Sequence, residues 1–336
     1  MSDYIASIFN QALVVLPEFS ISITLLLALI FDKYLGEAKR FHYLVGFGYL
    51  ARRLEKKVNN TDSQCSVKAK KNKKLMGALS WCLLVLPLPL LYFYFVNLNW
   101  YWQILFDASV IYLAIGLNSL HQHALQVFKP LISGDLANAR KFTGYLVSRD
   151  TSELSEQEMS RATIESMLEN GHDSVIASLF YYLIGGAPLV IIHRLANTLD
   201  AMWGYKNARF IDFGYASARL DDLLGFVSGK YCTLLYAIQG IKQGRFIKAV
   251  VNAYKQGNQY KSHNGGWVMA AGATVMARKL GGSAQYHGKE IHSVVLGYGN
   301  SVTTKDIPMS LIVVNRASVI LLMLVIIYQL ISYWLI

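Results

Sequence analysis

The chain has little charge and little cysteine for its length. Only 16% of its 336 residues are Asp, Glu, Lys or Arg, while 54% are hydrophobic. Soluble domains carry about 25% charged residues, so this composition argues against an ordinary soluble protein and indicates a polytopic membrane protein. The three cysteines, Cys65, Cys82 and Cys232, show no paired spacing, which argues against a disulfide framework or a zinc site.

Several common catalytic motifs are also missing. The chain has no G-x-S-x-G motif and no H-E-x-x-H motif, and residues 225–230 lack the spacing of a phosphate-binding loop. The beginning has no basic segment and its first apolar run contains Glu18, so we expect no cleaved signal peptide. We find no internal repeat, no low-complexity tail and no convincing strand-rich region. The predicted fold class is mainly α.

Long apolar runs take the place of charge. Residues 11–31, 75–96, 100–118 and 311–336 are each near the roughly 20 residues that a helix needs to cross a bilayer. A fifth run, 175–195, is interrupted by Gly185, Gly186 and Pro188, and such a break is tolerated only inside protein or beside a polar cavity. We therefore predict about four crossing helices and, at 175–195, a broken re-entrant or buried hairpin. The alternative is a fifth crossing.

Positive charge gathers in one connecting segment, with 12 Lys and Arg against four acids between Asp32 and Lys74. Short basic loops between spans mark the cytoplasmic side of a membrane protein. We thus predict that 32–74 is a cytoplasmic loop of a single membrane domain, 1–336, whose functional region is 119–310. Nucleic-acid binding is the other interpretation of a basic run such as Lys68–Lys74. Because the basic run lies beside an apolar run, we interpret it as a loop that fixes the orientation in the membrane. We therefore expect no nucleic-acid partner.

Residues 197–222 combine charged and aromatic side chains. Seven charged residues lie between Asp200 and Asp222, and five aromatic residues lie among them between Trp203 and Tyr215. A buried span cannot carry so many charges cheaply, and this mixture suits a half-buried polar pocket at a membrane surface. The cations could bind phosphate or carboxylate groups and the carboxylates could bind a metal. An interfacial network of ion pairs explains the same composition equally well.

Two further polar patterns lie outside this segment. Glu165, Glu169 and Asp173 repeat every four residues, so they share one face of a predicted helix over 153–173. That stripe would suit magnesium or a cationic amine, although a solvated helix face is the alternative. Residues 262–267 contain Asn264 and two glycines, which fit either a ligand-binding turn or an ordinary helix entry. A small-residue helix is predicted at 266–280, ended by Lys279 and the glycines at 281–282.

Taken together, these segments resemble the CobD/CbiB family of cobalamin biosynthesis, the adenosylcobinamide-phosphate synthases. The resemblance covers most of the chain and is densest in residues 197–222. The other matching parts are Leu29–Asp32 with Gly36, Glu37 and His42, then Gly144–Thr151, Arg161–Asp173, Asn264–Trp267, and Tyr286 with Gly288.

The resemblance implies a multi-pass enzyme of the bacterial inner membrane with its active site facing the cytoplasm. It would join the propionate carboxyl of adenosylcobyric acid to an aminopropanol, or to its phosphate, in an ATP-dependent amide synthesis. Activation of the carboxylate, for instance as an acyl phosphate, would use Mg²⁺ and basic side chains to stabilise phosphoryl oxygens. The implied partners are a corrinoid, a small aminoalcohol, membrane lipid and other membrane enzymes of the cobalamin pathway.

The matching positions and this chemistry give a set of candidate site residues. For catalysis and metal binding we expect Asp200, Asp221 and Asp222. Glu165 or Glu169 would orient or deprotonate the amine. The expected substrate-binding residues are His42, Arg149, Asp150, Asn170, Lys206, Asn207, Arg209, Arg219 and Asn264.

The chain departs from the family pattern in places. Ala38, Tyr43 and Ser178 stand where prolines are usual, and Gly171 and His172 replace the usual Thr-Ser/Val. His172 lies between candidate acids, so it bears on the local geometry and on the amine. The competing interpretation is a non-catalytic membrane sensor or signalling protein like the AmpE branch, which has largely lost the string that 197–222 retains. A transporter, the third interpretation, would need more ionisable residues within the spans.

Overall fold

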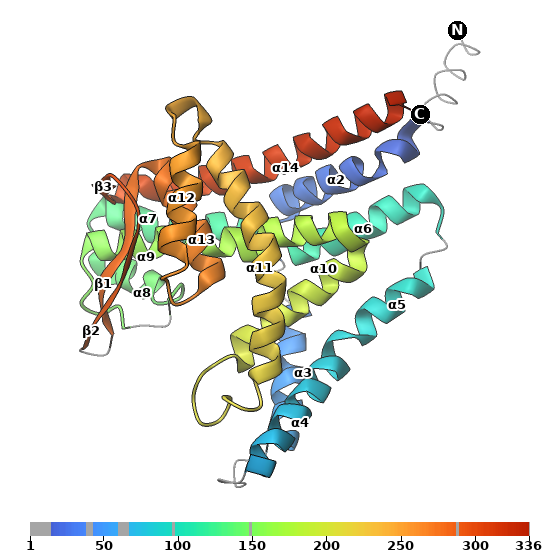
Figure 1. The fold of residues 1–336 in the computed structure, drawn as a ribbon, viewed down its shortest axis with the longest axis horizontal. Helices are drawn as coiled ribbons and strands as arrows, with labels where there is room; N and C mark the ends of the chain where they lie inside the picture. Colours follow the sequence, from blue (N-terminus) through green and yellow to red (C-terminus); the bar gives the residue numbers. More distant parts are fainter. Residues whose placement is uncertain are drawn as a thin grey trace. The chain divides into compact units, whose positions relative to one another are not determined.

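The computed structural model describes residues 15–37, 43–59, 67–95, 98–147, 150–286 and 289–335. These residues are mostly helical, with one small sheet, which confirms the mainly α class (Figure 1). They form two compact units, each drawn from separate stretches of sequence. The first takes residues from 1–115, 178–216 and 319–336, and the second from 116–177 and 217–318. The single domain over 1–336 stays a prediction.

The first unit consists of helices. Their bounds are η1 (Leu16–Phe19), α2 (Ser20–Leu35), α3 (Tyr43–Val58), α4 (Val67–Val85), α5 (Pro87–Phe95), α6 (Trp100–Ala114), nearly all of α10 (Ala177–Trp203) and the second half of α14 (Ile307–Leu335). The end of α14 lies beside α2 (Figure 1), where Gln329 Oε1 accepts from Ser22 N at 3.1 Å. Gln329 Nε2 also donates to the Glu18 carbonyl at 2.7 Å. This amide therefore ties two apolar helices that are far apart in sequence.

Among the residues that the structure describes, four helical stretches are long and apolar enough to cross a membrane, namely Ala69–Tyr94, Trp100–Ser133, Glu156–Trp203 and Thr304–Leu335. They confirm a polytopic membrane protein. Three of them overlap the predicted spans at 75–96, 100–118 and 311–336, and the remaining one contains 175–195. The predicted span at 11–31 begins outside the described residues, and its described part is not among the four stretches. A crossing there stays a prediction.

The backbone of α10 breaks at the predicted glycines. Gly185 has φ −150° and ψ 26°, and Gly186 has φ 64° and ψ −162°, neither of which is helical. The positive φ of Gly186 requires a residue without Cβ. Pro188 comes two residues later and cannot donate a helical hydrogen bond. The break in 175–195 is confirmed, while its assignment as a hairpin rather than a crossing stays a prediction.

One carboxylate of the first unit lies inside an apolar helix. Asp107 on α6 is only 6% exposed. It accepts hydrogen bonds from Tyr92 Oη at 2.9 Å, Gln103 Nε2 at 2.8 Å and Tyr182 Oη at 3.1 Å. A carboxylate in such surroundings is costly unless it is bonded. The three donors offset that cost and join α5, α6 and α10.

The second unit contains the remaining helices and the sheet. Its elements are α7 (Leu117–Ser133), α8 (Leu136–Thr143), α9 (Glu156–Gly171), the π-helix η2 (His172–Ile176), most of α11 (Tyr215–Ile238), η3 (Ile241–Gln243), α12 (Phe246–Gly257), α13 (His263–Met276), β1 (Arg278–Tyr286), β2 (Lys289–Gly297), β3 (Asn300–Ser301), η4 (Thr304–Asp306) and the first part of α14.

The prediction of no strand-rich region is wrong for residues 278–301. β1 pairs antiparallel with β2, with Lys279 opposite Gly297, and β3 pairs parallel with β1. The helix predicted at 266–280 ends earlier, at Met276, because Ala277 adopts a left-handed conformation with φ 53°. The glycines predicted to stop this helix form a bulge in β1 instead. A bulge interrupts the alternation that marks a strand, which hid this one.

Helix α9 packs in the middle of the second unit. Ser155 and Glu158 cap its beginning with a reciprocal capping box. Further along, a Cβ at Gly272 of α13 would lie 2.7 Å from Leu168 Cδ2, so glycine lets the two helices approach closely. Tyr236 Oη of α11 donates to the Leu168 carbonyl at 3.1 Å. Through these contacts α9 presents its acidic stripe to α13, β1 and α11.

Candidate functional site

Glu165, the first acid of the α9 stripe, holds the bulge of β1. Its Oε1 accepts a hydrogen bond from Gly281 N at 2.7 Å. Arg161 Nη1, one turn earlier on α9, donates to the Gly281 carbonyl at 2.8 Å. Both side chains therefore clamp the backbone of one glycine. One carboxylate oxygen of Glu165 therefore holds the backbone of β1, and a role of this residue toward the amine stays a prediction.

Glu169, one turn further on, lies against the beginning of α13. A Cβ at Gly265 would come within 2.2 Å of Glu169 Oε1, so a larger residue there would push the carboxylate out of this position. Lys261, Asp173 and Glu165 are the charged side chains that act on it. Glu165 and Glu169 are both half-buried. The alternative of a solvated helix face therefore does not describe these two acids.

His172 connects the end of α9 to α11. It is fully buried, and its Nε2 lies 2.9 Å from Ser228 Oγ. Its Nδ1 lies 2.7 Å from Asp173 Oδ1, although the two atoms are not aligned as a hydrogen bond. The order Ser, His, Asp resembles a hydrolase triad, but Ser228 is completely buried and donates to the Leu224 carbonyl at 3.0 Å. A substrate cannot reach this hydroxyl, so the contact is structural.

Asn264 joins the beginning of α13 to α11. Its Nδ2 donates to the Asp222 carbonyl at 3.0 Å, and a Cβ at Gly225 would lie 2.6 Å from the same nitrogen. Ser262 caps α13 through a hydrogen bond from Gly265 N at 3.2 Å. Residues 262–267 thus have the geometry of a helix entry, and a ligand-binding role for the same turn stays a prediction. The same turn brings two predicted site residues, Asn264 and Asp222, together.

Lys230 is a residue of this region that the sequence analysis did not single out. Its Nζ lies 2.9 Å from the centre of the Trp267 ring and 5.0 Å from that of Phe226. Burial lowers the pKa of Lys230 to about 8, and no described residue forms an ion pair with it. Phe226 and Lys230 follow Asp222 at four and eight residues on α11. That spacing places all three on one helix face and could have identified the lysine.

The part of 197–222 that belongs to the first unit contains mostly turn-forming contacts. Gly204 N donates to the Asp200 carbonyl at 2.7 Å, and a Cβ at Gly204 would lie 2.0 Å from Asp200 Oδ1. Asn207 Oδ1 accepts from the backbone N–H groups of Arg209 and Phe210, each at 3.1 Å. Lys206 is exposed. Asp200 and Asn207 thus shape the loop that follows α10.

Arg209 forms a two-pronged ion pair with Glu55 of α3. Arg209 Nε donates to Glu55 Oε1 at 2.9 Å, and Nη2 contacts Oε2. Asn59 Nδ2 donates to Glu55 Oε1 at 2.8 Å and to the Arg209 carbonyl at 3.0 Å. Burial alone would raise the pKa of Glu55, but hydrogen bonds from Arg209 and Asn59 and the charge of Arg209 hold it below its ordinary value. Arg209 therefore takes part in an ion pair, as the alternative interpretation of residues 197–222 expects.

Replacing this arginine should destabilise the first unit in a pH-dependent way. Because the pKa of Glu55 is lower in the folded chain than its ordinary 4.5, the pair stabilises above that pH and loses its effect as the pH falls through the folded value. We expect Arg209→Met to lower the free energy of unfolding by about 1–3 kcal/mol and to flatten the acid limb of the thermal stability in detergent. An equal loss in Arg53→Met, an exposed arginine of α3, would contradict this.

The other predicted site residues lie apart from these contacts. Asp150 is exposed and accepts from Ser152 N at 2.9 Å, and Asn170 donates to the Ser166 carbonyl at 2.9 Å. Arg219 is exposed and Asp221 half-buried on α11. His42 and Arg149 lie outside the described residues. Roles for all these residues stay predictions.

A comparison with known protein families matches most of the chain. The profile of the CobD/Cbib protein family matches residues 25–314, a range that contains every candidate site residue. The chain belongs to the CobD/CbiB family. No solved structure matches it.

Three relatives align with this chain over nearly their full lengths. A cobalamin biosynthesis protein CobD of Stutzerimonas stutzeri is 43% identical over 290 residues, covering 86% of this chain and 91% of that one. A protein of the same name from Chromobacterium violaceum is 42% identical over 292 residues, with the same coverage. Another from Halalkalibacterium halodurans is 35% identical over 302 residues, covering 88% and 92%. Membership in the CobD/CbiB family gives this chain a role in cobalamin biosynthesis.

The described acids of this CobD/CbiB member suit a magnesium ion that takes its other ligands from a substrate. Among the described residues, no three His, Cys, Asp or Glu side chains are grouped so that they could hold a metal ion by themselves. Mg²⁺ often binds one or two carboxylates and takes its other ligands from substrate phosphates and water. Asp222, which is exposed on α11, can supply such a carboxylate. The donor set therefore suits an ion shared with a nucleotide.

Proposed function

We propose that this chain catalyses an ATP-dependent amide synthesis in cobalamin biosynthesis. It would join the propionate carboxyl of adenosylcobyric acid to an aminopropanol or its phosphate. In the structure, the proposal rests on the first turn of α13, where Gly265 accommodates the Glu169 carboxylate and Asn264 binds the Asp222 carbonyl. This turn joins a half-buried acid, an exposed acid and, through Trp267, a lysine with a lowered pKa.

The reaction needs two steps. A carboxylate oxygen of the corrinoid takes the terminal phosphoryl group of ATP, which releases ADP and leaves an acyl phosphate. The amine then attacks the carbonyl carbon, loses a proton and displaces phosphate. Glu169 is the residue that we assign to accept this proton, because it is half-buried and lies against the beginning of α13.

Charge on the phosphoryl oxygens must be stabilised in both steps. The Lys230 ammonium is desolvated by the Trp267 ring, and an ammonium in such surroundings interacts strongly with an anion. Asp222 would share a magnesium ion with the nucleotide, and the chemistry supplied by that ion is neutralisation of phosphate charge. Asn264 orients the segment of α11 that carries Asp222.

We further propose that the protein lies in the bacterial inner membrane with residues 197–222 facing the cytoplasm, where ATP is available. The basic segment 32–74 supports this orientation. A cysteine introduced at position 206 and treated with a membrane-impermeant maleimide tests the proposal. Labelling from the outer face of intact cells would contradict it.

Complementation tests the proposed activity most directly. We expect the chain to restore cobalamin synthesis in a strain blocked between cobyric acid and cobinamide, with growth responding to an added aminopropanol. The purified protein should form the amide and ADP in equal amounts. A folded, membrane-inserted protein that yields neither growth nor amide would contradict the proposal and favour the non-catalytic AmpE-like interpretation.

Asp222→Asn should remove a metal ligand without disturbing the fold. We expect this change to lower kcat/KM for ATP by about a hundredfold, the scale of losing one charged ligand of a phosphoryl group, with part of the loss recovered at high Mg²⁺ concentration. Asp212→Asn, an acid of the 197–222 segment that only approaches Lys74 at 3.9 Å, serves as the control. Equal activities of the two variants would refute a ligand role for Asp222.

A further inference from the structure

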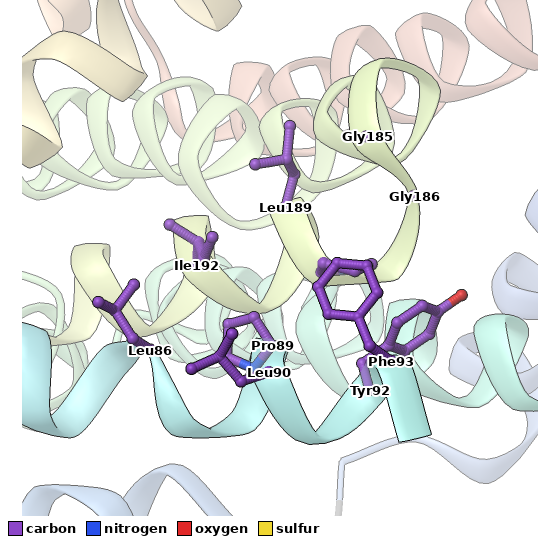
Figure 2. Close-up of a pocket in the computed structure, with 10 residues that line it drawn as sticks. Leu86, Pro89, Leu90, Tyr92, Phe93, Gly185, Gly186, Leu189 and Ile192 are labelled. Carbon is purple, nitrogen blue, oxygen red and sulfur yellow. The ribbon is translucent and has the colours of Figure 1, made fainter. Parts of the chain in front are cut away.

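Two apolar cavities follow one another along α10 in the first unit. The larger, of about 510 Å³, lies between α5 and the break in α10. Figure 2 shows its walls, with Pro89 and Phe93 on α5 and Gly186 and Ile192 on α10. Its lining contains no charged side chain. The break in α10 thus opens a space that the side chains of α5 do not fill.

A second, smaller cavity lies nearer the end of α10. It has about 290 Å³ and is lined by residues of α3, α5, α6 and α10. Tyr92 lines both cavities, and Ile191 of the smaller one is followed in sequence by Ile192 of the larger one. At the far end the lining includes Arg194 and Tyr43, of which Arg194 is the one charged residue. Both cavities are therefore apolar, they meet at Tyr92, and the smaller one has a single cation in its lining.

Arg194 has unused hydrogen-bonding capacity. The guanidinium interacts with the Tyr43 hydroxyl, and that hydroxyl donates to the Leu113 carbonyl at 2.6 Å. The Nε atom of Arg194, however, is buried and has no hydrogen-bond partner among the described residues. Buried donors are normally satisfied, so an unpartnered one indicates a missing acceptor. An anionic acceptor would suit it best, since hydrogen bonds between charged groups are the strong ones.

The position of Arg194 along its helix indicates at which level of the membrane that acceptor lies. The apolar run 175–192 ends directly before His193 and Arg194, and both cavities are lined by helices long and apolar enough to span a bilayer. Arginines at the end of such a run reach the level of the lipid phosphates. A soluble polar substrate gains nothing from the apolar walls, whereas a phospholipid matches both the walls and the cation.

We propose that these two neighbouring cavities together bind one anionic phospholipid, with its phosphate on Arg194 and an acyl chain running along α10 past Tyr92 to the break at Gly186. The lipid fills the space between α5 and α10, so its binding stabilises the first unit. This site involves none of the candidate catalytic residues and does not depend on the proposed activity.

Purification in a mild detergent followed by native mass spectrometry tests the proposal. We expect one anionic phospholipid, such as phosphatidylglycerol, to remain bound per chain. Arg194→Gln should reduce the bound fraction about tenfold, the scale of one charged hydrogen bond. Ile192→Trp, which fills the larger cavity, should reduce it as well. The control is Arg316→Gln, an exposed arginine in the α14 span that lines neither cavity.

Thermal unfolding keeps the test decisive if a variant folds poorly. Added phosphatidylglycerol should raise the melting temperature of the delipidated natural protein more than phosphatidylcholine does, and this difference should be lost in Arg194→Gln. Retention of no lipid together with equal effects of the two lipids would overturn the proposal. So would an equal loss of lipid in Arg316→Gln, which would show general annular lipid, or a bound apolar molecule without phosphate.

Discussion

Glu169→Gln is expected to lower kcat/KM for amide formation by about a hundredfold to ten-thousandfold, the usual range for removal of a general base. The amide side chain keeps the size of the carboxylate but cannot accept the proton of the attacking amine. Because the contact with Gly265 is a matter of space, the variant should fold and insert normally. Amide formation by the purified variants, with ATP and amine saturating, measures the effect.

Two other acids make this prediction specific. Glu153→Gln, at an exposed position before α9, should leave activity unchanged. Glu165→Gln should weaken the clamp on Gly281, where Oε1 accepts the backbone N–H at 2.7 Å, and should lower the melting temperature more than the catalytic rate. A Glu169→Gln variant with full activity, or one whose activity falls only in step with its stability, would exclude the base assignment.

The apolar helices were predictable because composition alone decides them, whereas α3, which lies within the segment 32–74 predicted as a loop, was not. Apolar runs at 75–96, 100–118 and 311–336 leave helix as the only secondary structure that satisfies the backbone in lipid. The break in α10 was also predictable, since the preferences of glycine and proline are local. What composition could not provide is the partner of each helix, such as the contact of Gln329 with Ser22 across 307 residues.

The sheet was missed because its pairing is not local and its pattern is interrupted. Gly281 and Gly282 adopt positive φ angles of 68° and 79° inside β1. In a helical context a glycine pair indicates the end of a helix, so the same residues predicted the wrong element. Only the contact with Arg161 and Glu165, at least 116 residues away, shows why a bulge is stable there.

For the candidate site, the sequence indicated the chemistry better than the geometry. Glu165 and Glu169 share a helix face as predicted, but Gly281 and Gly265 give them different surroundings. Arg209 carries the right charge for phosphate, yet Glu55, 154 residues earlier, engages it. Such partners cannot be inferred from spacing along the chain.

Lys230 should make the activity depend on pH in a way that Trp267 controls. As the pH rises through about 8, the pKa to which burial lowers Lys230, the ammonium loses its charge and its ability to bind an anion. We expect kcat/KM to fall over that range. Trp267→Leu would let water reach the ammonium, so its pKa should return toward the ordinary 10.5 and the alkaline limb should move up by about one pH unit or more.

Substitutions of the lysine itself test the same assignment. Lys230→Arg keeps a cation throughout this range and should remove the limb near pH 8. Lys230→Met should weaken substrate binding about tenfold or more at every pH, the scale of a charged hydrogen bond. Lys242→Met, at an exposed position in η3, is the matched control. A limb that stays in place in both Trp267→Leu and Lys230→Arg would assign it to another group.

Stability and activity should change in opposite directions over this range, which excludes unfolding as the cause of the limb. The pKa of Lys230 is about 8 in the folded chain and 10.5 ordinarily, so between these values the unfolded chain binds more protons. The linkage relation then requires the contribution of Lys230 to the free energy of unfolding to rise with pH. Activity that falls while the melting temperature holds or rises therefore reports the loss of the positive charge on Lys230. Trp267→Leu should reduce both trends together.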